Sequence, residues 1–515
     1  MQDYAHPILT CEEALEFEKN LLSGREAAWA AMNHAGRSLG RAALDDFCEV
    51  AHPSSRTHRR PHILVLVGKG HNGGDALLAA DELLRIRPEG EAYILPLCDK
   101  TEARTLTRRA WDALEKTGKA QTIPVLKLSS QSYDICFDGL LGMQFQPPLR
   151  DGAAELLRAV NDTAKIKFRV AVDLPSGLGD KDAFRADFTY ATGIVKAPAI
   201  LPEHVKNVGR LRYLDIGFFD EFYTGPQAAG EDILTADILA PLREWRPADA
   251  EKRTFGHLFI LAGSRSMPGA LLMNAKAALH SGVGLVTAFA PESVASQLAA
   301  QLPEVMWTPW PETPDGGLAL EGWLLLREKL PRATALLCGS GIGNEPETRK
   351  LVEEIVAEVP VPVILDADAL QPSIIEAAMK RNPDTGLILT PHAGEFKRLT
   401  GRNSATYDRD ALTWFAHKHN VITVFKGPLT RITDGRLVQA SPFGGPVLAR
   451  GGSGDLLGGL IGGLVAQTPR QPFRATATGV VWHGTAADFL AREKGAVSVA
   501  TTELLNYLSA VLRSG

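Results

Sequence analysis

The sequence predicts an α/β protein in which buried, mainly parallel strands alternate with helices. Short apolar runs recur along the whole chain, and amphipathic stretches separate them. This alternation is typical of strand-helix-strand units, whose helices cover both faces of the sheet. Hydrophobic residues make up 45% of the 515 and charged residues 22%. The composition therefore provides a sizeable core and excludes a mostly disordered chain.

In the first half, one helical face is visible, with Ala153, Leu156, Leu157 and Val160 at helical spacing. The strands expected there are Ile63 to Val67, Ala92 to Leu97, Ile135 to Asp138 and Phe168 to Asp173.

In the second half, a helix is expected from Pro346 onward, with Leu351, Val352, Ile355 and Val359 on its apolar face. The strands expected there are Leu258 to Ala262, Leu285 to Phe289, Ala335 to Cys338, Val363 to Asp366, Leu387 to Thr390 and Val421 to Phe425.

Between the halves, Tyr223 to Thr254 is rich in proline, glycine and charge and shows no strand signal. We place the boundary there. The predicted organisation is a first domain over residues 1–225, a linker over 226–245 and a second domain over 246–515.

Charge and targeting signals exclude several function classes. The formal net charge of −5 gives no field that would attract nucleic acid or an anionic membrane. The apolar stretch Leu456 to Pro469 is too short to span a bilayer, and the acidic first residues lack a secretion signal. The five cysteines form no Cys-x-x-Cys pair. We therefore expect a cytoplasmic protein with free thiols and no membrane partner.

A glycine-rich turn follows the first strand. Gly68, Gly70 and Gly73 satisfy the spacing of a dinucleotide-binding fingerprint, and helix Ala76 to Leu84 follows. Backbone N–H groups at such a helix start bind anions, and Asp99 could bind a ribose. The glycine pattern alone is weak evidence for a dinucleotide site, because a tight turn that binds no ligand would show the same glycines.

Polar groups follow other strands of the first half as well. Asn72, Asp75, Asp138, Asp173 and Ser176 all lie at predicted strand ends. In an open α/β sheet the ligand crevice lies beyond the carboxyl ends of the strands, so the five side chains could converge there. Any one of them alone could equally be a helix cap.

The second half contains a more specific turn. Gly451 to Gly454 precede Asp455 and feed an apolar helix. Free N–H groups there can stabilise a transferring phosphoryl group, and the carboxylate can take a proton from an attacking hydroxyl. The alternative is an ordinary N-cap on a buried helix.

Other polar turns follow strands of the second half. His392 taken alone would more often be structural, but its place between Pro391 and Gly394 favours a site, whereas His483 reads as structural. The turns are Ala262 to Ala270, Gly339 to Gly343, Asp366 to Leu370, Thr390 to Glu395 and Lys426 to Thr430.

The first-half motifs resemble the epimerase domain of the NAD(P)H-hydrate repair enzymes, which interconvert the R and S hydrates of the nicotinamide cofactor at C6. The matching segments are Asn72 to Asp75, Asp138 to Gly142, Pro147 to Arg150, Val172 to Gly177 and Asp187 to Lys196. The resemblance implies a Rossmann-like three-layer domain in which Asn72, Asp138 and Ser176 hold potassium and Asp173 contacts the reacting ring. Oxygen donors of this kind suit a hard cation.

The resemblance to the epimerase domain also implies which residues surround the hydrated dinucleotide. They are His71, Asn72, Gly73, Gly74 and Asp75, with Gly142, Met143, Gln144, Phe145, Gln146, Pro147 and Pro148. The chain departs from the family at His71 (usually Asn), Ala76 (usually Gly) and Met143 (usually Thr). The last change removes a hydroxyl from a turn that faces phosphate.

The second-half motifs, in order, resemble the ribokinase-like dehydratase domain of the same enzymes, with Ser340 and Ile342 where Pro and Leu are usual. The resemblance implies that Ala270, Gly343, His392 and Asp455 bind the S-hydrate, with Asp455 and His392 catalytic. It implies a nucleotide, ADP in bacterial-type members and ATP in eukaryotic ones, carried with Mg²⁺. Its expected ligands are Lys426, Gly427, Pro428, Leu429, Thr430 and Gly454.

Two other functional interpretations of the sequence stay open. A small-molecule kinase fused to a Rossmann-like binding module would share the second-half turn, and a stable phosphorylated product would distinguish it. A scaffold protein would have no need for Asp138, Asp173 and Asp455. The sequence leaves open ADP against ATP and hydrated NADH against hydrated NADPH; a homo-oligomer is expected.

Overall fold

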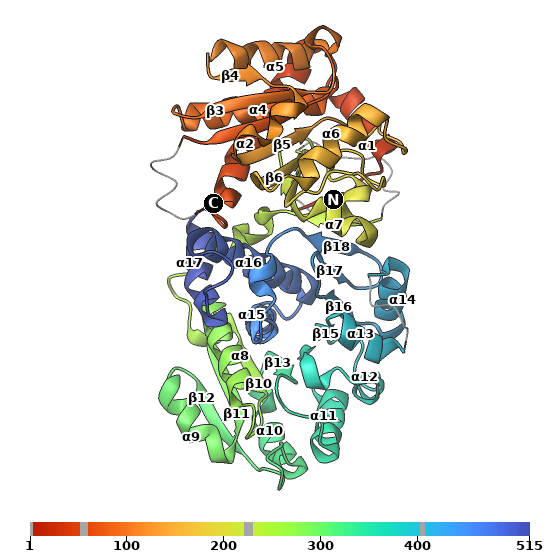
Figure 1. Ribbon diagram of the computed structural model, residues 1–515. Helices are drawn as coiled ribbons and strands as arrows, with labels where there is room; N and C mark the ends of the chain where they lie inside the picture. The colour runs from red at the N-terminus through yellow and green to blue at the C-terminus, as the bar shows by residue number, and fades with distance from the viewer. Residues whose placement is uncertain (1–3, 52–59, 221–229, 402–406, 515) are drawn as a thin grey trace. The chain divides into compact units, whose positions relative to one another are not determined.

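The computed structural model describes residues 4–51, 60–220, 230–401 and 407–514 (Figure 1). Contacts divide the chain into two compact units. The first comprises residues 1–235 together with Ala491–Ser498, and the second comprises Ala236–Leu490 and Val499–Gly515. The short C-terminal piece of the first unit could not be foreseen from the sequence, because it depends on where the chain returns in space.

The first unit is built on a sheet whose strands are all parallel, in the order β4-β3-β2-β5-β6-β7-β8. Strand β2 lies between β3 and β5, and its apolar residues 63–67 are fully buried, which explains why that strand is recognisable from the sequence. The strands are β2 (His62–Val67), β3 (Glu91–Pro96), β4 (Ala120–Thr122), β5 (Tyr133–Gly139), β6 (Ile166–Val172), β7 (Phe188–Thr192) and β8 (Arg210–Leu214).

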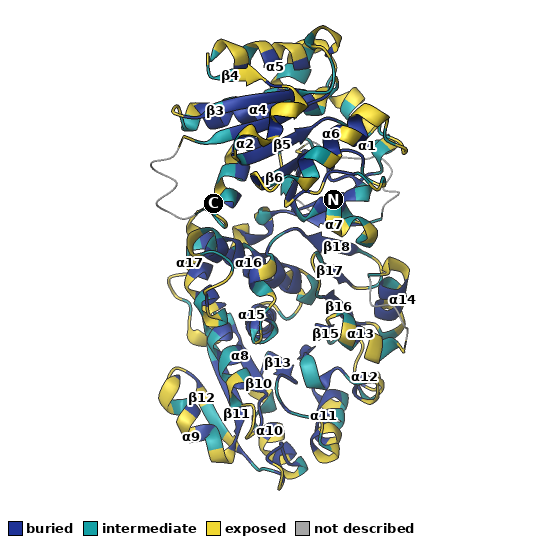
Figure 2. Ribbon diagram, viewed as in Figure 1, coloured by how far each residue is buried: buried dark blue, intermediate teal, exposed yellow. Residues whose placement is uncertain are grey.

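Helices cover both faces of this sheet, which makes three layers. Odd-numbered β2 residues such as Val65 pack with helices α2 (Arg25–Phe47), α4 (His71–Ile86) and α5 (Thr105–Lys116). Even-numbered ones such as Leu64 pack with α6 (Asp151–Asp162) on the other face. Figure 2 shows the inner strands buried and the outer helix faces exposed. The predicted α/β class with a mainly parallel sheet is confirmed in this unit.

Three local expectations are wrong in the first unit. The segment expected to lack strands contains β9 (Asp232–Leu234), which pairs antiparallel with β1 (Ala5–Pro7). Its three residues are too few to give a periodic signal. Helix α4 begins at His71 and not at Ala76, so Asn72 to Asp75 form its first turn. Strands β7 and β8 were not expected; β8 alternates arginine with apolar residues and reads as polar.

The second unit contains a mixed sheet in the order β18-β17-β16-β15-β14-β13-β10-β11-β12. Strands β10 to β16 pair in parallel, and β17 and β18 run antiparallel at the end of the order. The strands are β10 (His257–Leu261), β11 (Leu285–Pro291), β12 (Met306–Trp310), β13 (Ala335–Cys338), β14 (Val363–Leu365), β15 (Leu387–Leu389), β16 (Ile422–Phe425), β17 (Thr430–Thr433) and β18 (Val438–Ser441).

This sheet also lies between helices. One face packs on α10 (Trp323–Lys329), α11 (Pro346–Glu358), α12 (Pro372–Ala378), α13 (Ala393–Thr400) and α14 (Arg409–His419). The other is covered by α8 (Pro268–His280) and α15 (Ser453–Gln467), which pack closely together. Helices α9 (Glu292–Gln301), α16 (Pro472–Lys494) and α17 (Leu505–Arg513) complete the layers (Figure 1).

Two expectations about the whole chain can be compared with the structure. Among the described residues, no helix is long and apolar enough to cross a membrane. All five cysteines are free thiols, as expected.

Candidate functional sites

In the first unit, a network of polar groups gathers at the carboxyl ends of β5 and β6. The carboxylate of Asp138, on β5, is fully buried. Its Oδ1 accepts a hydrogen bond from Ser176 Oγ at 2.6 Å, and its Oδ2 accepts one from Ser176 N at 2.7 Å. Burial raises the pKa of Asp138 to about 6, against the opposing effect of the Ser176 hydrogen bonds. A buried acid of this kind is stabilised in its charged form by any cation beside it.

Asn72, at the start of α4, joins the same network. Its Nδ2 donates to Val172 O at 2.9 Å and to Leu141 O at 3.4 Å, while Leu141 N donates to Ser176 Oγ at 2.8 Å. A Cβ at Gly142 would lie 2.7 Å from Asn72 Oδ1, so the turn approaches this side chain closely. The structure therefore brings Asn72, Asp138 and Ser176 together. The donors are all oxygens and include one carboxylate, a set that fits a hard monovalent cation.

The segments expected to surround a dinucleotide border this network. His71 is exposed, Asn72 and Asp75 are half-buried, and Gly73 and Gly74 are buried in the first turn of α4. The turn from Gly142 to Pro148 is open to solvent, and Gln144, Gln146, Pro147 and Pro148 are exposed.

Met143 has a packing role in this turn. It lies against a buried apolar cluster that includes Leu9, Ala14, Ile194 and Phe219. The Met143 side chain therefore adds apolar packing to this turn, where the family usually has the hydroxyl of a threonine.

Asp173 follows β6 and sits in a left-handed backbone conformation with φ of +69°. A residue other than glycine adopts this conformation uncommonly, although aspartate tolerates it better than most, and such residues cluster at functional sites. The carboxylate is buried and its Oδ1 accepts a hydrogen bond from Lys196 Nζ at 2.6 Å. The sequence analysis did not predict Lys196 as a site residue, although Lys196 ends the matching segment that begins at Asp187. Asp99, in contrast, caps a short helix by accepting from Thr101.

In the second unit, Asp455 lies in the first turn of α15, whose N-cap Gly452 has φ of +87°. Burial, together with the charge of Asp366, raises the pKa of Asp455 to about 6, while Lys426 opposes the shift. The backbone carbonyl of Asp455 accepts a 2.7 Å bond from Asn274 Nδ2, on α8. Because Asn274 is fully buried, this bond fixes the turn against the neighbouring helix.

Asp366 begins one of the predicted polar turns, but the sequence analysis gave it no role in the site. It follows β14, is 2% exposed, and its Oδ1 accepts from Lys426 Nζ at 3.0 Å and from Thr390 Oγ1 at 2.6 Å. A Cβ on Gly454 would lie 3.4 Å from Lys426 Nζ. Asp366, Lys426, Gly454 and Asp455 therefore share one site. The available signal was the position of Asp366 directly after a strand.

His392 is the N-cap of α13. Its Nδ1 accepts hydrogen bonds from Gly394 N at 3.0 Å and Glu395 N at 3.2 Å. In the neutral ring the hydrogen must then lie on Nε2. The side chain is 58% exposed, and its Nε2 lies 3.4 Å from Glu395 Oε1. His392 is thus both a cap and a potential donor.

The remaining predicted residues of the second unit flank these groups. Gly343 N donates to Asp368 Oδ2 at 3.0 Å, and Ala270 lies in the first turn of α8. Lys426 to Thr430 connect β16 to β17; Gly427 and Pro428 are exposed, and Leu429 and Thr430 are half-buried. In the described part of the chain, no group of three or more His, Cys, Asp and Glu side chains is arranged to hold a metal.

Comparisons with known proteins agree across both units. The NAD(P)H-hydrate dehydratase family model matches residues 258–510, and the model described as YjeF-related protein N-terminus matches residues 29–201. The bifunctional NAD(P)H-hydrate repair enzyme of Moorella thermoacetica is 32% identical, covering 88% of this chain and 87% of that protein. The one from Thermosynechococcus vestitus is 32% identical over 98% and 97%. This chain belongs to the bifunctional NAD(P)H-hydrate repair enzyme family.

The repair enzyme thus combines an NAD(P)H-hydrate epimerase with an NAD(P)H-hydrate dehydratase, and the predicted resemblance is confirmed. Among solved structures, a Bacillus subtilis ADP/ATP-dependent NAD(P)H-hydrate dehydratase co-crystallised with ATP and Mg²⁺ is 29% identical. It covers 52% of this chain and 93% of that chain, with a TM-score of 0.44.

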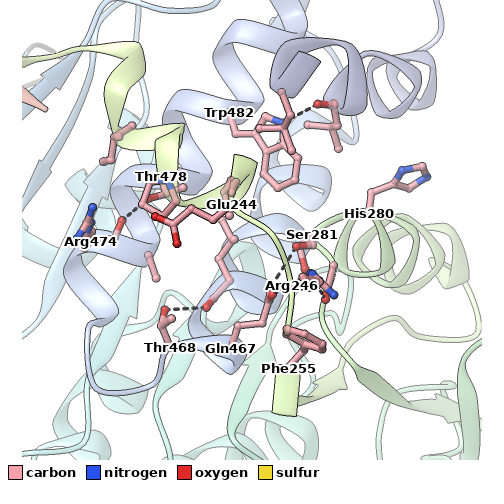
Figure 3. Close-up of a pocket in the computed structure, with 18 of the residues that line it drawn as sticks. Glu244, Arg246, Phe255, His280, Ser281, Gln467, Thr468, Arg474, Thr478 and Trp482 are labelled. Atoms are coloured by element: carbon pink, nitrogen blue, oxygen red, sulfur yellow. Dashed lines mark hydrogen bonds between the residues drawn. The ribbon is translucent and has the colours of Figure 1, made fainter. Parts of the chain in front are cut away.

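The repair enzyme also has a pocket of about 510 Å³ in its second unit, shown in Figure 3. Its lining includes His280 and Gln467, which end α8 and α15, whereas Ala270 and Asp455 lie in the first turns of those helices. Arg246 fills part of the wall, with its guanidinium over the Phe255 ring and a 2.9 Å bond to Gly282 O. The pocket is therefore separate from the candidate dehydratase site.

Proposed function

We propose that the epimerase site lies in the first unit, around Asp173, and the dehydratase site in the second unit, around Asp455. The chemistry of the side chains supports this division. Inversion at C6 needs proton transfer, for which the buried Asp173 and Lys196 pair is suited. Nucleotide-driven dehydration needs a base beside an anion cradle, which Asp455 and the first-turn amides of α15 provide. We propose the domains as residues 1–225 and 246–515, with a linker over 226–245 between them.

In the epimerase, the C6–O bond breaks with its electron pair on oxygen, and a proton from the cluster at Asp173 allows the hydroxyl to leave as water. The ring nitrogen lone pair forms a C6=N1 iminium. Water then adds from the opposite face and returns a proton to the cluster. His71 to Asp75 and Gly142 to Pro148 would hold the dinucleotide, with α4 amides directed at phosphate.

Potassium fits the network of Asn72, Asp138 and Ser176, and we propose that these residues hold it. When bound, the ion would place a positive charge beside the cofactor's anionic groups. Asp138 supplies the balancing charge, and the Ser176 hydroxyl orients its carboxylate. This geometry of oxygen donors is the observation that carries the assignment.

In the dehydratase, Asp455 would take the proton of the C6 hydroxyl as that oxygen attacks the terminal phosphorus of the nucleotide. With ADP the leaving group is AMP. Elimination of the phosphate from C6, with loss of a proton from C5, restores the ring. Lys426 and the amides ending at Gly454 would neutralise the phosphoryl charge, and His392 would donate to the S-hydrate through Nε2–H. Mg²⁺ would arrive bound to the phosphates of the nucleotide, because it commonly takes only a few of its ligands from the protein.

Varying the monovalent cation tests the potassium assignment on the full chain. R-to-S conversion by the wild type should rise with potassium against sodium. Ser176→Ala should need on the order of tenfold more potassium, because a ligand and the hydrogen bond that orients Asp138 are both lost. Ser129→Ala, at an exposed serine, is the matched control. An unchanged potassium response in Ser176→Ala would rule out this site.

A further inference from the structure

Lys196 lies at the centre of a buried cluster of acidic groups in the first unit. The residue is 1% exposed, its Nζ is 2.6 Å from Asp173 Oδ1, and it is 3.5 Å from Glu18 Oε1. Lysine is rarely buried without such partners. The Asp173 carboxylate alone can balance the charge of Lys196. The presence of a second carboxylate, that of Glu18, therefore requires a separate explanation.

Glu18 comes from α1 (Cys11–Leu21), a helix outside the segment matched by the N-terminal family model, which begins at residue 29. Its position beside Lys196 is fixed by the backbone. Leu9 N donates to Val195 O at 3.0 Å, and Ala197 N donates to Leu9 O at 2.8 Å, so the bonds bracket Lys196. A capping box between Thr10 and Glu13 then starts α1.

Packing holds the rest of α1 in place. The ring of Phe17 stacks on Phe219 with centroids 5.2 Å apart, and Ala14 is buried in the same cluster as Leu9. Glu18, one residue after Phe17, is therefore directed inward by a fixed helix face. Its side chain is 26% exposed, against 2% for Lys196 and 7% for Asp173, so Glu18 is the solvent-facing end of the cluster.

The cluster contains more carboxyl groups than cations. The groups that face Lys196 are Asp173, Glu18 on α1, Asp75 in the first turn of α4 and the Cys11 thiol. Burial raises the pKa values of Asp173, Glu18 and Asp75, and the Asp173 and Glu18 charges raise that of Asp75 further. Burial lowers the pKa of Lys196, but Asp173 and Glu18 outweigh it and the net shift is upward. The cluster thus has one cation for three carboxyl groups, and the excess negative charge favours protonation.

We propose that Glu18 is a positioning residue of the epimerase, which holds Lys196 against Asp173 and keeps a transferable proton in the buried cluster. The inference rests on the proposed epimerase site at Asp173. Inversion at C6 needs a proton for the departing hydroxyl and a group that accepts one from the incoming water. An ionised Asp173 carboxylate can only accept a proton, and the additional negative charge of Glu18 raises the proton affinity of the neighbouring groups that can donate one, Asp75 and Lys196.

The pH dependence of R-to-S conversion by the full chain tests this role. Glu18→Gln removes the negative charge and so lowers the pKa of the proton-retaining groups. Because the donor acts in its protonated form, the alkaline limb of kcat/KM should move to lower pH by about half to one unit. Near the optimum we expect kcat to fall about threefold or more, with little change in KM, since positioning affects the chemical step.

Two variants of the same helix give the comparison. Glu16→Gln neutralises an exposed glutamate two residues away and should leave the profile unchanged. Glu18→Asp keeps the charge and should return the alkaline limb toward the wild type. Circular dichroism and thermal denaturation of each preparation report whether the first unit has folded, and the dehydratase rate on S-hydrate reports the same for the second unit.

The outcomes separate the two claims. If the wild type interconverts the hydrates and Glu18→Gln gives the same pH profile as Glu16→Gln, the role of Glu18 is wrong while the epimerase stands. If Glu18→Gln and Glu18→Asp lose activity equally with no shift of the alkaline limb, Glu18 is structural only. If the wild type does not interconvert the hydrates, the epimerase site and this inference fall together.

Discussion

Each unit uses a buried aspartate and a lysine from different strand ends of its own sheet. Asp173 pairs with Lys196 in the first unit, and Asp366 pairs with Lys426 in the second. A buried pair of this kind contributes little net stability, since desolvation offsets attraction. Its effect at a site is to fix the charge and direction of two groups before a ligand binds.

The dehydratase should lose activity in acid because Asp455 must be ionised to act as a base. Burial raises the pKa of Asp455 to about 6, and Asp366 adds to the shift. The carboxylate is therefore protonated below that pH, and kcat/KM for S-hydrate should fall about tenfold for each further pH unit. A pH profile at saturating nucleotide measures this limb.

Asp366→Asn provides the check on the cause. Removal of that negative charge should move the acid limb of the dehydratase to lower pH, even though Lys426 loses a partner. A limb that stays in place in Asp366→Asn would contradict the electrostatic account of Asp455.

Close packing of two helices positions the dehydratase turn. A Cβ on Gly459 of α15 would overlap the carbonyl oxygen of Asn274 on α8, and that residue also holds the Asp455 carbonyl. The glycine therefore lets the helices approach until Asn274 reaches the turn that carries Asp455.

Gly459→Ala should separate α8 from α15 and disturb Asp455. We expect a loss of about 1–3 kcal/mol in the free energy of unfolding of the second unit, as for other overpacked cores. Dehydratase kcat should fall while the epimerase rate is retained. Thermal denaturation and both assays measure these effects.

Gly458→Ala is the matched control, since its Cβ would make only ordinary contacts of 3.6 Å or more. The same loss in both variants would indicate a general helix effect and contradict the packing argument.

Elements with a strong local signal were predictable, and elements that depend on distant contacts were not. The apolar run of β2 is readable because both faces are buried. The first turn of α4 was read as a loop from its glycines, yet a Cβ on Gly74 would lie 2.7 Å from Met32 Sδ of α2. Close packing of α2 and α4 thus selects glycine inside a helix, against its local propensity.

The residues of the candidate sites also divide into those with a local sequence signal and those that depend on distant contacts. Asn72, Asp138, Ser176 and Asp455 are recognisable because family motifs carry them at strand ends. Glu18 lies on a separate helix far away in sequence, and its partner Lys196 is visible as a partner only once the strands are assembled. No local pattern indicates such a contact.

At the scale of the whole molecule, the 515 residues form two large units. Both activities act on one damaged cofactor pool. Because hydration gives both epimers and elimination consumes the S form, an epimerase in the same chain allows the whole pool to be repaired. The expected homo-oligomer remains a prediction.

The most direct test of two activities in separate sites is one assay of Asp455→Asn in the full chain. Purified R-hydrate is incubated with ADP or ATP and potassium, while the R-to-S ratio and the recovered reduced-nicotinamide absorbance are followed together. We predict R-to-S conversion at the wild-type rate with no nucleotide-dependent recovery of absorbance. Near-normal recovery, or loss of R-to-S conversion in a folded Asp455→Asn protein, would contradict the assignment.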